Sequence, residues 1–256
     1  MFNLFKKEPT LEFFSLIPEV TQVAPIVHAS TYKPDWFIKA QQEFVEATKD
    51  QDFGKHKSIH TAKCPGVFNL IRYGWVMTTY QDIVIKTNGD GESFEWRTPV
   101  NQATLNNNGV IDAVGFHAKE QLAVYQGGWK DSLNSVIKIN TPWRCIVPKG
   151  YYLYENHLPY SEEKRFTTLP GFYSQEYGVS QLNVQLQWHI LDDEVLIKAG
   201  TPIAHYMLIP KHEARLMVSD ASPEQLAAEK VTQLEISKRY VSDKAKSKCV
   251  FARMFK

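Results

Sequence analysis

The stretch Leu182–Asn183–Val184–Gln185–Leu186–Gln187–Trp188 decides the fold class. Apolar and polar residues alternate through it without a break, so an extended chain would place Leu, Val, Leu and Trp on one face and Asn and both Gln on the other. A helix would scatter the same residues around its surface. We therefore predict a strand over residues 181–188 that is buried on one face.

Strand-length segments of similar character surround this stretch in the second half of the chain. Pro and Gly residues separate them and punctuate the pattern. We predict strands at residues 135–140, 151–155, 194–199 and 203–209. Short strands at this density indicate an antiparallel sandwich or barrel rather than a doubly wound parallel sheet.

The first half of the chain is more mixed. The apolar spacing predicts a helix that begins at Asp35 and ends near residue 49. The turn signal Asn88–Gly89–Asp90–Gly91 predicts a hairpin, because Asn and Gly tolerate positive φ. We predict strands at residues 11–16, 66–75, 81–87 and 91–97, and a polar, Asn-rich excursion at residues 101–128 in which 110–116 forms a strand of its own.

The chain changes character at Ser222. The sequence Ser222–Pro223–Glu224–Gln225 supplies an N-cap hydroxyl, a proline at the first helical position and a glutamine at the third. These are the components of a capping box. We therefore predict a helix that starts directly after Ser222.

The composition excludes several classes of protein. The chain has 256 residues, of which 43% are hydrophobic and 22% charged, with no long apolar run and no low-complexity stretch. Collagen-like, coiled-coil, disordered and transmembrane proteins are therefore excluded. Three widely spaced cysteines without a CxxC pair argue against a disulfide framework or a structural zinc site. The start of the chain, MFNLFKKEPTLEFF, lacks the apolar core of a secretory signal, so we expect no secretion by that route.

A basic tail is concealed by the near-neutral total charge. Residues 238–256 carry seven basic residues against Asp243 alone, whereas the rest of the chain carries 22 basic and 27 acidic residues. One interpretation is a solvated helix end, and the other is a tether onto an acidic surface, a neighbouring subunit or nucleic acid. The tether would use the residues Lys238, Arg239, Lys244, Lys246, Lys248, Phe251, Arg253 and Phe255.

Two groups of residues have the chemistry of metal ligands, and neither has the expected pattern. His56, His60 and Cys64 are four residues apart, but Pro65 and Gly66 directly after them argue against one helical face. A cupin-like cluster would combine His157, His189 and His205 with Glu162 or Glu163, yet the chain contains no His-x-His pair. We predict no metal and no cofactor. No GxSxG elbow, Walker lysine loop or GxGxxG helix start is present either.

Three motifs in order resemble the dUTPase and dCTP-deaminase family. They are Pro148–Lys149–Gly150–Tyr151, Leu169–Pro170–Gly171–Phe172, and Ile197–Lys198–Ala199–Gly200–Thr201–Pro202–Ile203–Ala204–His205, which is similar to the family's closing motif. The resemblance implies a β-clip, a distorted barrel of short strands that normally forms trimers with sites between subunits.

The polar residues of that family's chemistry are missing. No arginine-containing phosphate turn follows Tyr154, where Glu155 would repel a phosphate. The family's catalytic aspartate corresponds to Ser174 or Leu169, depending on the alignment, and neither can act as a base. We therefore assign no catalytic residue and expect no enzymatic activity. The alternative is a divergent nucleotide-binding or nucleotide-processing protein, with a pocket formed by Glu155, His157, Glu176 and Tyr177.

A second resemblance covers most of residues 60–210. Cys64–Pro65–Gly66–Val67–Phe68, Gly74–Trp75–Val76, Asp82–Ile83–Val84–Ile85 and Thr141–Pro142–Trp143 are similar to segments of uncharacterised proteins encoded largely by bacteriophages. This resemblance implies a phage-type setting but no mechanism.

The predicted protein is mainly β, with three portions. A β-rich portion with one helix spans residues 1–134, a dUTPase-like β-clip spans 135–212, and a helix with the basic tail spans 213–256. We expect a structural or assembly protein, in a virion or the host cytoplasm, that associates with itself, as a trimer by preference, and with other particle proteins. We expect no membrane contact, and nucleic-acid contact only through the tail. The further alternative is a cupin-like metal-binding protein.

Overall fold

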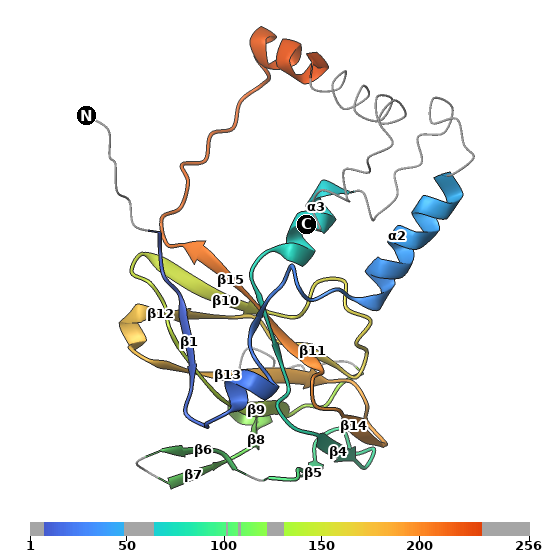
Figure 1. Cartoon of the computed structure of the whole chain (residues 1–256), viewed down its shortest axis with the longest axis vertical. Coiled ribbons are helices and arrows are strands. Elements are labelled where there is room, and N and C mark those ends of the chain that lie inside the picture. The colour runs from blue at the N-terminus through green and yellow to red at the C-terminus, as the bar shows by residue number, and fades with distance from the viewer. Residues whose placement is uncertain (1–7, 49–63, 101, 107–108, 122–130, 232–256) are drawn as a thin grey trace. The chain divides into compact units, whose positions relative to one another are not determined.

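Antiparallel sheets dominate the computed structural model, as the sequence predicts (Figure 1). The structure describes residues 8–48, 64–100, 102–106, 109–121 and 131–231. The chain divides into two units, one comprising residues 1–34 with 68–212 and the other residues 35–67 with 213–256. The strands within these described ranges all belong to the first unit.

Two five-stranded sheets form the first unit's main framework. The first has the order β1-β9-β13-β11, with β8 also paired to β9, and the second has the order β12-β10-β15-β3-β2. The strands of the first sheet are β1 (Glu12–Ser15), β8 (Val114–His117), β9 (Val136–Ile146), β11 (Phe166–Thr168) and β13 (Ser180–Trp188). Those of the second are β2 (Val27–His28), β3 (Trp75–Thr78), β10 (Tyr151–Asn156), β12 (Gly171–Ser174) and β15 (Pro202–Pro210).

Two smaller sheets complete this unit. One has the order β14-β4-β5, and the other is the hairpin β6-β7. Their strands are β4 (Ile83–Thr87), β5 (Phe94–Arg97), β6 (Gln102–Asn106), β7 (Gly109–Asp112) and β14 (Glu194–Ile197). The unit also contains the short helices α1 (Val20–Val23), η2 (Lys119–Gln121) and η4 (Gln175–Tyr177). The strand predicted at residues 110–116 is divided between β7 and β8.

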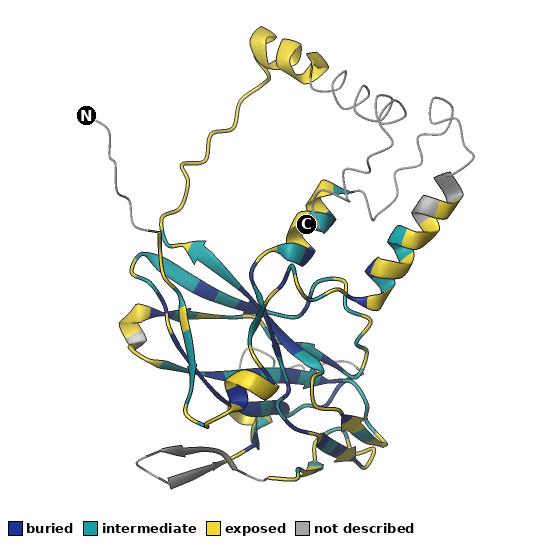
Figure 2. Ribbon diagram, viewed as in Figure 1, coloured by how far each residue is buried: buried dark blue, intermediate teal, exposed yellow. Residues whose placement is uncertain are grey.

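The alternating stretch forms β13 and faces the core as predicted. Leu182, Val184, Leu186 and Trp188 are fully buried, whereas the residues between them are partly exposed. They belong to a core cluster shared with Ile137 of β9 and residues of the second five-stranded sheet and of β4 and β14. Buried positions accordingly run along these strands in Figure 2.

A helix replaces the strand predicted at residues 66–75. α3 (Pro65–Arg72) begins with a proline, whose fixed φ suits the first helical position. Val67 and Ile71, four residues apart, form its buried face. Gly74, with φ of +85°, then turns the chain, and the strand starts only at Trp75. The strand prediction for this segment was therefore wrong over residues 66–74.

Two further helices belong to the second unit. α2 (Asp35–Thr48) starts at the predicted residue. The predicted helix after Ser222 covers residues 223–231 of the described chain and is exposed along its length (Figure 2). Its capping box is present: Ser222 Oγ accepts from the Gln225 amide at 3.2 Å, and Gln225 Oε1 accepts from the Ser222 amide at 2.7 Å.

Strands from both sides of residue 134 share sheets. β1 and β8 pair with β9, β3 pairs with β15, and β4 pairs with β14. The portions expected at 1–134 and 135–212 thus interleave within one unit. Residues 213–256 belong to the other unit, together with 35–67.

Candidate functional site

Glu155 lies in the interior of the sheet framework, whereas the alternative nucleotide hypothesis placed it in a ligand pocket. Strand alternation puts it on the same face of β10 as Leu153, and its side chain is only 3% exposed. Its Oε2 accepts a hydrogen bond of 2.6 Å from the Tyr206 hydroxyl and one of 3.3 Å from the Tyr173 hydroxyl. Three strands, β10, β12 and β15, therefore contribute to one buried acid–phenol cluster.

The interior shifts the ionisable groups of this cluster towards their neutral forms. Burial raises the pKa of Glu155 to about 7, although the hydrogen bonds from Tyr206 and Tyr173 act in the opposite direction. Burial and the nearby Glu155 carboxyl raise the pKa of the Cys145 thiol to about 12. A thiol with so high a pKa is a poor nucleophile. The cluster is thus suited to holding three strands together.

His157 lies beyond the end of β10, beside β11. Its Nδ1 accepts from the Thr168 amide at 3.1 Å, and burial lowers the pKa of the ring. His189 Nε2 is 2.8 Å from the Thr167 hydroxyl. His205 Nε2 is 2.6 Å from the carbonyl oxygen of Tyr73. The His205 ring, like that of His157, therefore has a backbone hydrogen-bond partner.

The structure does not gather these histidines into a cupin-like cluster. Of the two candidate carboxylates of that hypothesis, Glu162 is exposed, and Glu163 binds Arg165 through two hydrogen bonds. Within the described ranges, no group of three or more His, Cys, Asp or Glu side chains is arranged to hold a metal ion. Cys64 is partly buried, and its suggested partners His56 and His60 lie outside the described residues.

The four residues of the nucleotide-pocket hypothesis belong to different parts of the fold, with Glu155 alone on β10. Glu155 points into the interior and His157 follows the end of the strand. Glu176 lies near the beginning, since Ser174 pairs with Tyr152, and it is exposed and ion-paired with Lys211 at 2.7 Å. Tyr177 ends η4, and its side chain lies outside the description. The three described side chains do not converge.

The opposite face of the same sheet carries a different feature, which we name the outer aromatic face. It consists of Tyr152, Tyr154, Phe172, Met207 and Ile209, which strand pairing brings to one side of β10, β12 and β15. The Phe172 ring centroid lies 5.2 Å from that of Tyr152 and 5.1 Å from that of Tyr154. Phe172 is nevertheless 58% exposed. Sequence reasoning missed this face, because β12 was not predicted.

Charged residues border the outer aromatic face. Lys211 Nζ lies 4.7 Å from the centroid of the Tyr152 ring and also binds Glu176. The cation is therefore held over the aromatic ring. This corner brings one positive and one negative charge to the margin of an apolar surface.

The remaining predicted site lies outside the described residues. The tail candidates Lys238, Arg239, Lys244, Lys246, Lys248, Phe251, Arg253 and Phe255 all belong to residues 232–256. Their docking role stays a prediction.

Comparison with models of known protein families gave no match, and comparison with curated proteins gave none either. Among the helices that the structure describes, none has both the length and the apolar character required to cross a lipid bilayer.

Proposed function

We propose that the chain is a non-enzymatic assembly protein of a phage-type particle, which associates with copies of itself through the outer aromatic face. The observation that carries this proposal is the uneven cover of one sheet face. Near β3, Val76 is buried in a small cluster with Ala29 and Leu158. Near β12, the same face leaves Phe172 more than half exposed.

The chemistry of the exposed half suits a protein interface. Aromatic side chains and Met are enriched at the centres of interfaces. The aromatic side chains among them bury a large area with few rotatable bonds. Phe172 also lies on β12, the last strand in the order of its sheet. An end strand presents unpaired backbone groups that proteins normally cover.

A second copy of this chain is the occupant that we propose. Lys211 and Glu176 bring opposite charges to the margin of the face, so a like surface offers each of them a partner. We favour a closed ring of three subunits, and we retain the β-clip over residues 135–212 as part of the proposal. A closed ring covers the strand edges of every subunit. Support comes from the short antiparallel strands of this segment and from the family motifs.

The chemistry of the interior supports a role without catalysis. Glu155 is enclosed and hydrogen-bonded to two tyrosines, and the pKa of the Cys145 thiol is raised by burial. His157 and Glu176 lie near opposite ends of β10. Among the described residues, these groups therefore do not meet at a common reaction centre.

Sedimentation equilibrium of the full chain tests the proposal. We expect the mass of a trimer for the wild type and a shift to monomer for Phe172→Ser, because a polar side chain there removes the centre of the interface. Phe116→Ser is the matched control, since Phe116 is 54% exposed on β8 of the other large sheet. A monomeric wild type, or equal effects of the two variants, would contradict the proposal.

The basic tail is the proposed contact with other particle proteins. Deletion of residues 238–256 should abolish binding to such a partner while leaving the melting temperature nearly unchanged.

A screen of deoxynucleotides by thermal shift tests the alternative function, nucleotide binding. A ligand present at a hundred times its dissociation constant stabilises by about 2.7 kcal/mol, so a base-selective shift would replace assembly with nucleotide binding.

A further inference from the structure

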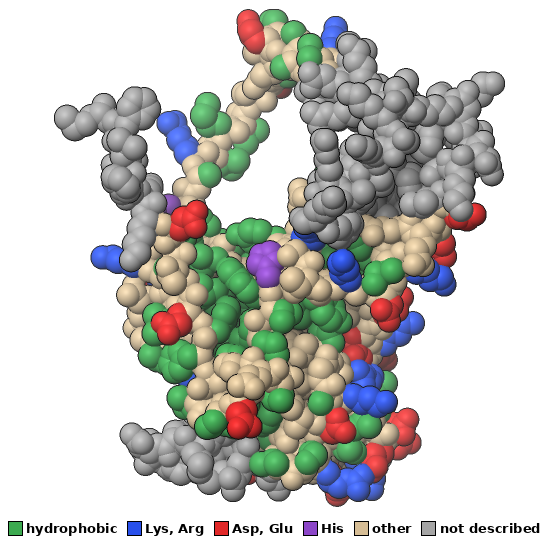
Figure 3. All heavy atoms as spheres, in the orientation of Figure 1, with side chains coloured by type: hydrophobic (Ala, Val, Ile, Leu, Met, Phe, Trp, Pro, Cys, Tyr) green, Lys and Arg blue, Asp and Glu red, His purple; other side chains and the backbone are tan. Residues whose placement is uncertain are grey.

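Residues 212–221, which we name the linking arm, connect β15 to the helix at residues 223–231. Every residue of the arm is exposed, and the arm belongs to no helix or strand of the described chain (Figure 2). Its middle consists of Leu216, Met217 and Val218, whose exposed fractions are 84%, 78% and 86%. Figure 3 shows hydrophobic side chains along this segment, which is orange in Figure 1. Adjacent large apolar side chains at such exposure indicate an interaction site.

The backbone of the linking arm is free to pair. Among the described residues, hydrogen bonds occur on both sides of the arm, at Lys211 and Ser222, but none involves residues 212–221. Prolines also flank the arm, at Pro210 and Pro223, and none occurs within it. Each residue of the arm therefore offers both an N–H donor and a C=O acceptor, as an added strand requires.

β12 offers an edge that such a strand could join. It is the last strand of its sheet and pairs only with β10 among the described strands. Its residues Gly171–Ser174 carry no charge. The two rings that contact Phe172, those of Tyr152 and Tyr154, both belong to β10. A strand added to β12 would therefore place a side chain against the part of the Phe172 ring that β10 leaves uncovered.

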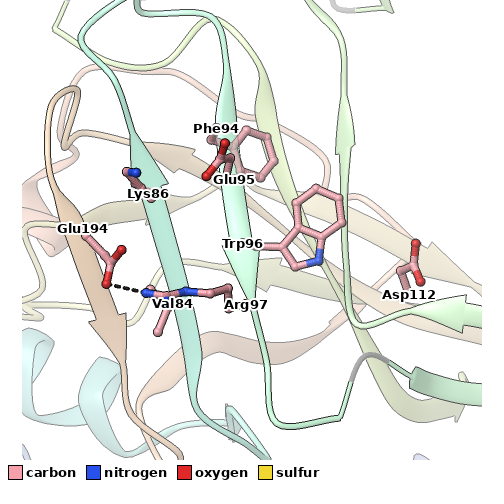
Figure 4. A pocket seen from close by; sticks show the side chains of 8 residues that line it. All are labelled: Val84, Lys86, Phe94, Glu95, Trp96, Arg97, Asp112 and Glu194. Atoms are coloured by element: carbon pink, nitrogen blue, oxygen red, sulfur yellow. Dashed lines mark hydrogen bonds and ion pairs between the residues drawn. The ribbon is translucent and has the colours of Figure 1, made fainter.

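Other end strands carry features that oppose the addition of a strand. β5 has the charged residues Glu95 and Arg97, beside a pocket of about 560 Å³ that Asp112 also lines (Figure 4). On β14, the carbonyl oxygen of Leu196 accepts a hydrogen bond of 2.7 Å from the Arg165 side chain. Within the described ranges, β12 has neither a charged side chain nor such a cap on its edge.

We propose that the linking arm of one subunit adds as an antiparallel strand to β12 of a neighbouring copy of this chain. The inference rests on the self-association proposed above and names the segment that performs it. Strand alternation places Leu216 and Val218 on one side, where they extend the outer aromatic face and cover Phe172, and Met217 on the other. Backbone pairing supplies affinity, and the alternating side chains supply specificity.

Charge favours the antiparallel direction. Arg215 directly precedes the apolar run of the arm, and Glu176 follows β12 with its side chain 70% exposed. Antiparallel pairing brings the start of one strand to the end of the other, so it brings Arg215 close to Glu176. Parallel pairing would instead bring Asp220 close to Glu176, and two like charges there would repel each other.

This mode of contact is compatible with a closed ring. Each subunit would extend its arm to the next subunit and receive an arm from the previous one, so every β12 edge in the ring would be covered. Fully extended, the arm spans about 33 Å at about 3.3 Å per residue. That length is comparable with the diameter of a small domain, about 30 Å, so the arm can reach a neighbouring subunit.

Sedimentation equilibrium of the full chain tests the arm with Leu216→Ser, Met217→Ser and Val218→Ser combined. We expect the dissociation constant of the oligomer to rise at least tenfold, because the apolar contacts of the added strand are lost. The fold of the subunit should tolerate these changes, since all three side chains are exposed. Val23→Ser is the matched control, because Val23 is 74% exposed on α1, and it should sediment like the wild type.

A charge exchange tests the direction of the added strand. Arg215→Glu should weaken association several-fold, because it places two carboxylates together where the arm meets the end of β12. Adding Glu176→Lys to the same chain should restore the association, because opposite charges then face each other again. Failure of the second substitution to restore association would contradict the antiparallel arrangement.

Photo-crosslinking distinguishes exchange of the arm from attachment within one subunit. Benzoylphenylalanine in place of Met217 is incorporated into ¹⁴N and ¹⁵N chains, which are mixed, allowed to exchange and irradiated. We expect crosslinks to β12 that join a ¹⁴N peptide to a ¹⁵N peptide. Crosslinks to β12 within a single isotope alone would show that the arm pairs with its own subunit, and would overturn the proposal.

The arm and the outer aromatic face can fail separately. A monomeric wild type would overturn both proposals. An oligomer that dissociates in Phe172→Ser but keeps its mass in the combined serine variant would overturn the role of the arm alone. In that case the outer aromatic face would remain the interface without an added strand.

Discussion

The hydroxyl of Tyr206 donates a hydrogen bond of 2.6 Å to Oε2 of Glu155 inside the sheet framework. The two residues are direct neighbours across β10 and β15, so the bond reinforces a pair that the backbone already aligns. It places an ionisable group where water has little access. The pH dependence of folding should therefore carry the signature of this single carboxyl.

Glu155→Gln should remove one component of that pH dependence. The folded protein raises the pKa of Glu155 from its ordinary value of 4.5 to about 7, so the folded state binds the proton more tightly than the unfolded chain. The resulting stabilisation is present in full below pH 4.5 and is lost as the pH rises to about 7. The loss amounts to roughly 3 kcal/mol at about 1.4 kcal/mol per unit.

Urea unfolding of wild type and Glu155→Gln between pH 4.5 and 8 measures this component. His157, His189 and His205 have lowered pKa values through burial, so they contribute stability that grows with pH in an overlapping window. Only the difference between the two proteins isolates Glu155. A constant difference across the whole range would show that the carboxyl titrates at its ordinary pKa.

Tyr206→Phe should raise the pKa of Glu155 further. The hydroxyl of Tyr206 stabilises the charged carboxylate, so its removal leaves burial with less opposition. We also expect a loss of about 1–3 kcal/mol in the free energy of unfolding, because a buried acceptor loses its shortest hydrogen bond. Carboxyl ¹³C chemical shifts, followed against pH, report the pKa directly. Tyr173→Phe is the control, and its longer bond of 3.3 Å predicts a smaller shift.

Gly74→Ala should destabilise the protein far more than Gly91→Ala. Both glycines have positive φ, at +85° and +73°, but a Cβ at Gly74 would overlap the carbonyl oxygen of Tyr206, whereas Gly91 faces open space. Strain in the left-handed region alone accounts for about 1 kcal/mol at Gly91. The added backbone clash should bring the loss at Gly74 to about 4 kcal/mol. Chemical denaturation measures both, and equal losses would rule out the close approach.

Ser222→Ala should weaken the helix at residues 223–231 without affecting the sheets. The substitution removes the side-chain oxygen that accepts from the Gln225 amide. Loss of such a cap typically amounts to about 1 kcal/mol. Amide exchange at Gln225 should accelerate about fivefold, the factor that corresponds to this energy, while exchange in β13 stays unchanged. Ser222→Thr preserves the hydroxyl and should restore most of the protection.

The most regular elements could be predicted from patterns among residues that are close in the sequence. The alternation in β13 and the capping box after Ser222 each depend on residues that are close in sequence, and both are confirmed. α3 was missed because Pro65 and Gly66 interrupt strands and helices alike, and the run that ends at Trp75 contains enough apolar residues for either. β11 and β12 have only three and four residues and exist through pairing with β13 and β10.

The site was less accessible to sequence reasoning than the fold. A charged residue in a strand is ordinarily assigned to the solvent face, and only the alternative nucleotide hypothesis took Glu155 as a ligand contact. Glu155 is two residues from the apolar Leu153 in the same strand, so strand alternation places both side chains on one face. This spacing was the signal that Glu155 faces inward. The outer aromatic face required the register of β10, β12 and β15, which depends on long-range pairing. The pocket beside β5 likewise depends on Asp112, which reaches it from a different hairpin.

The interleaved sheets also determine when this chain can begin to fold. His205 contacts the backbone of Tyr73 across 132 positions of sequence, and β3 finds its partner β15 only after β15 has been synthesised. A ribosome that has translated only as far as β13 has released β3 and β4 without their partners β15 and β14. Contacts of such long range slow folding and leave strand edges open to other chains. We therefore expect the nascent protein to expose unpaired strand edges until nearly all of its sheet-forming sequence has emerged.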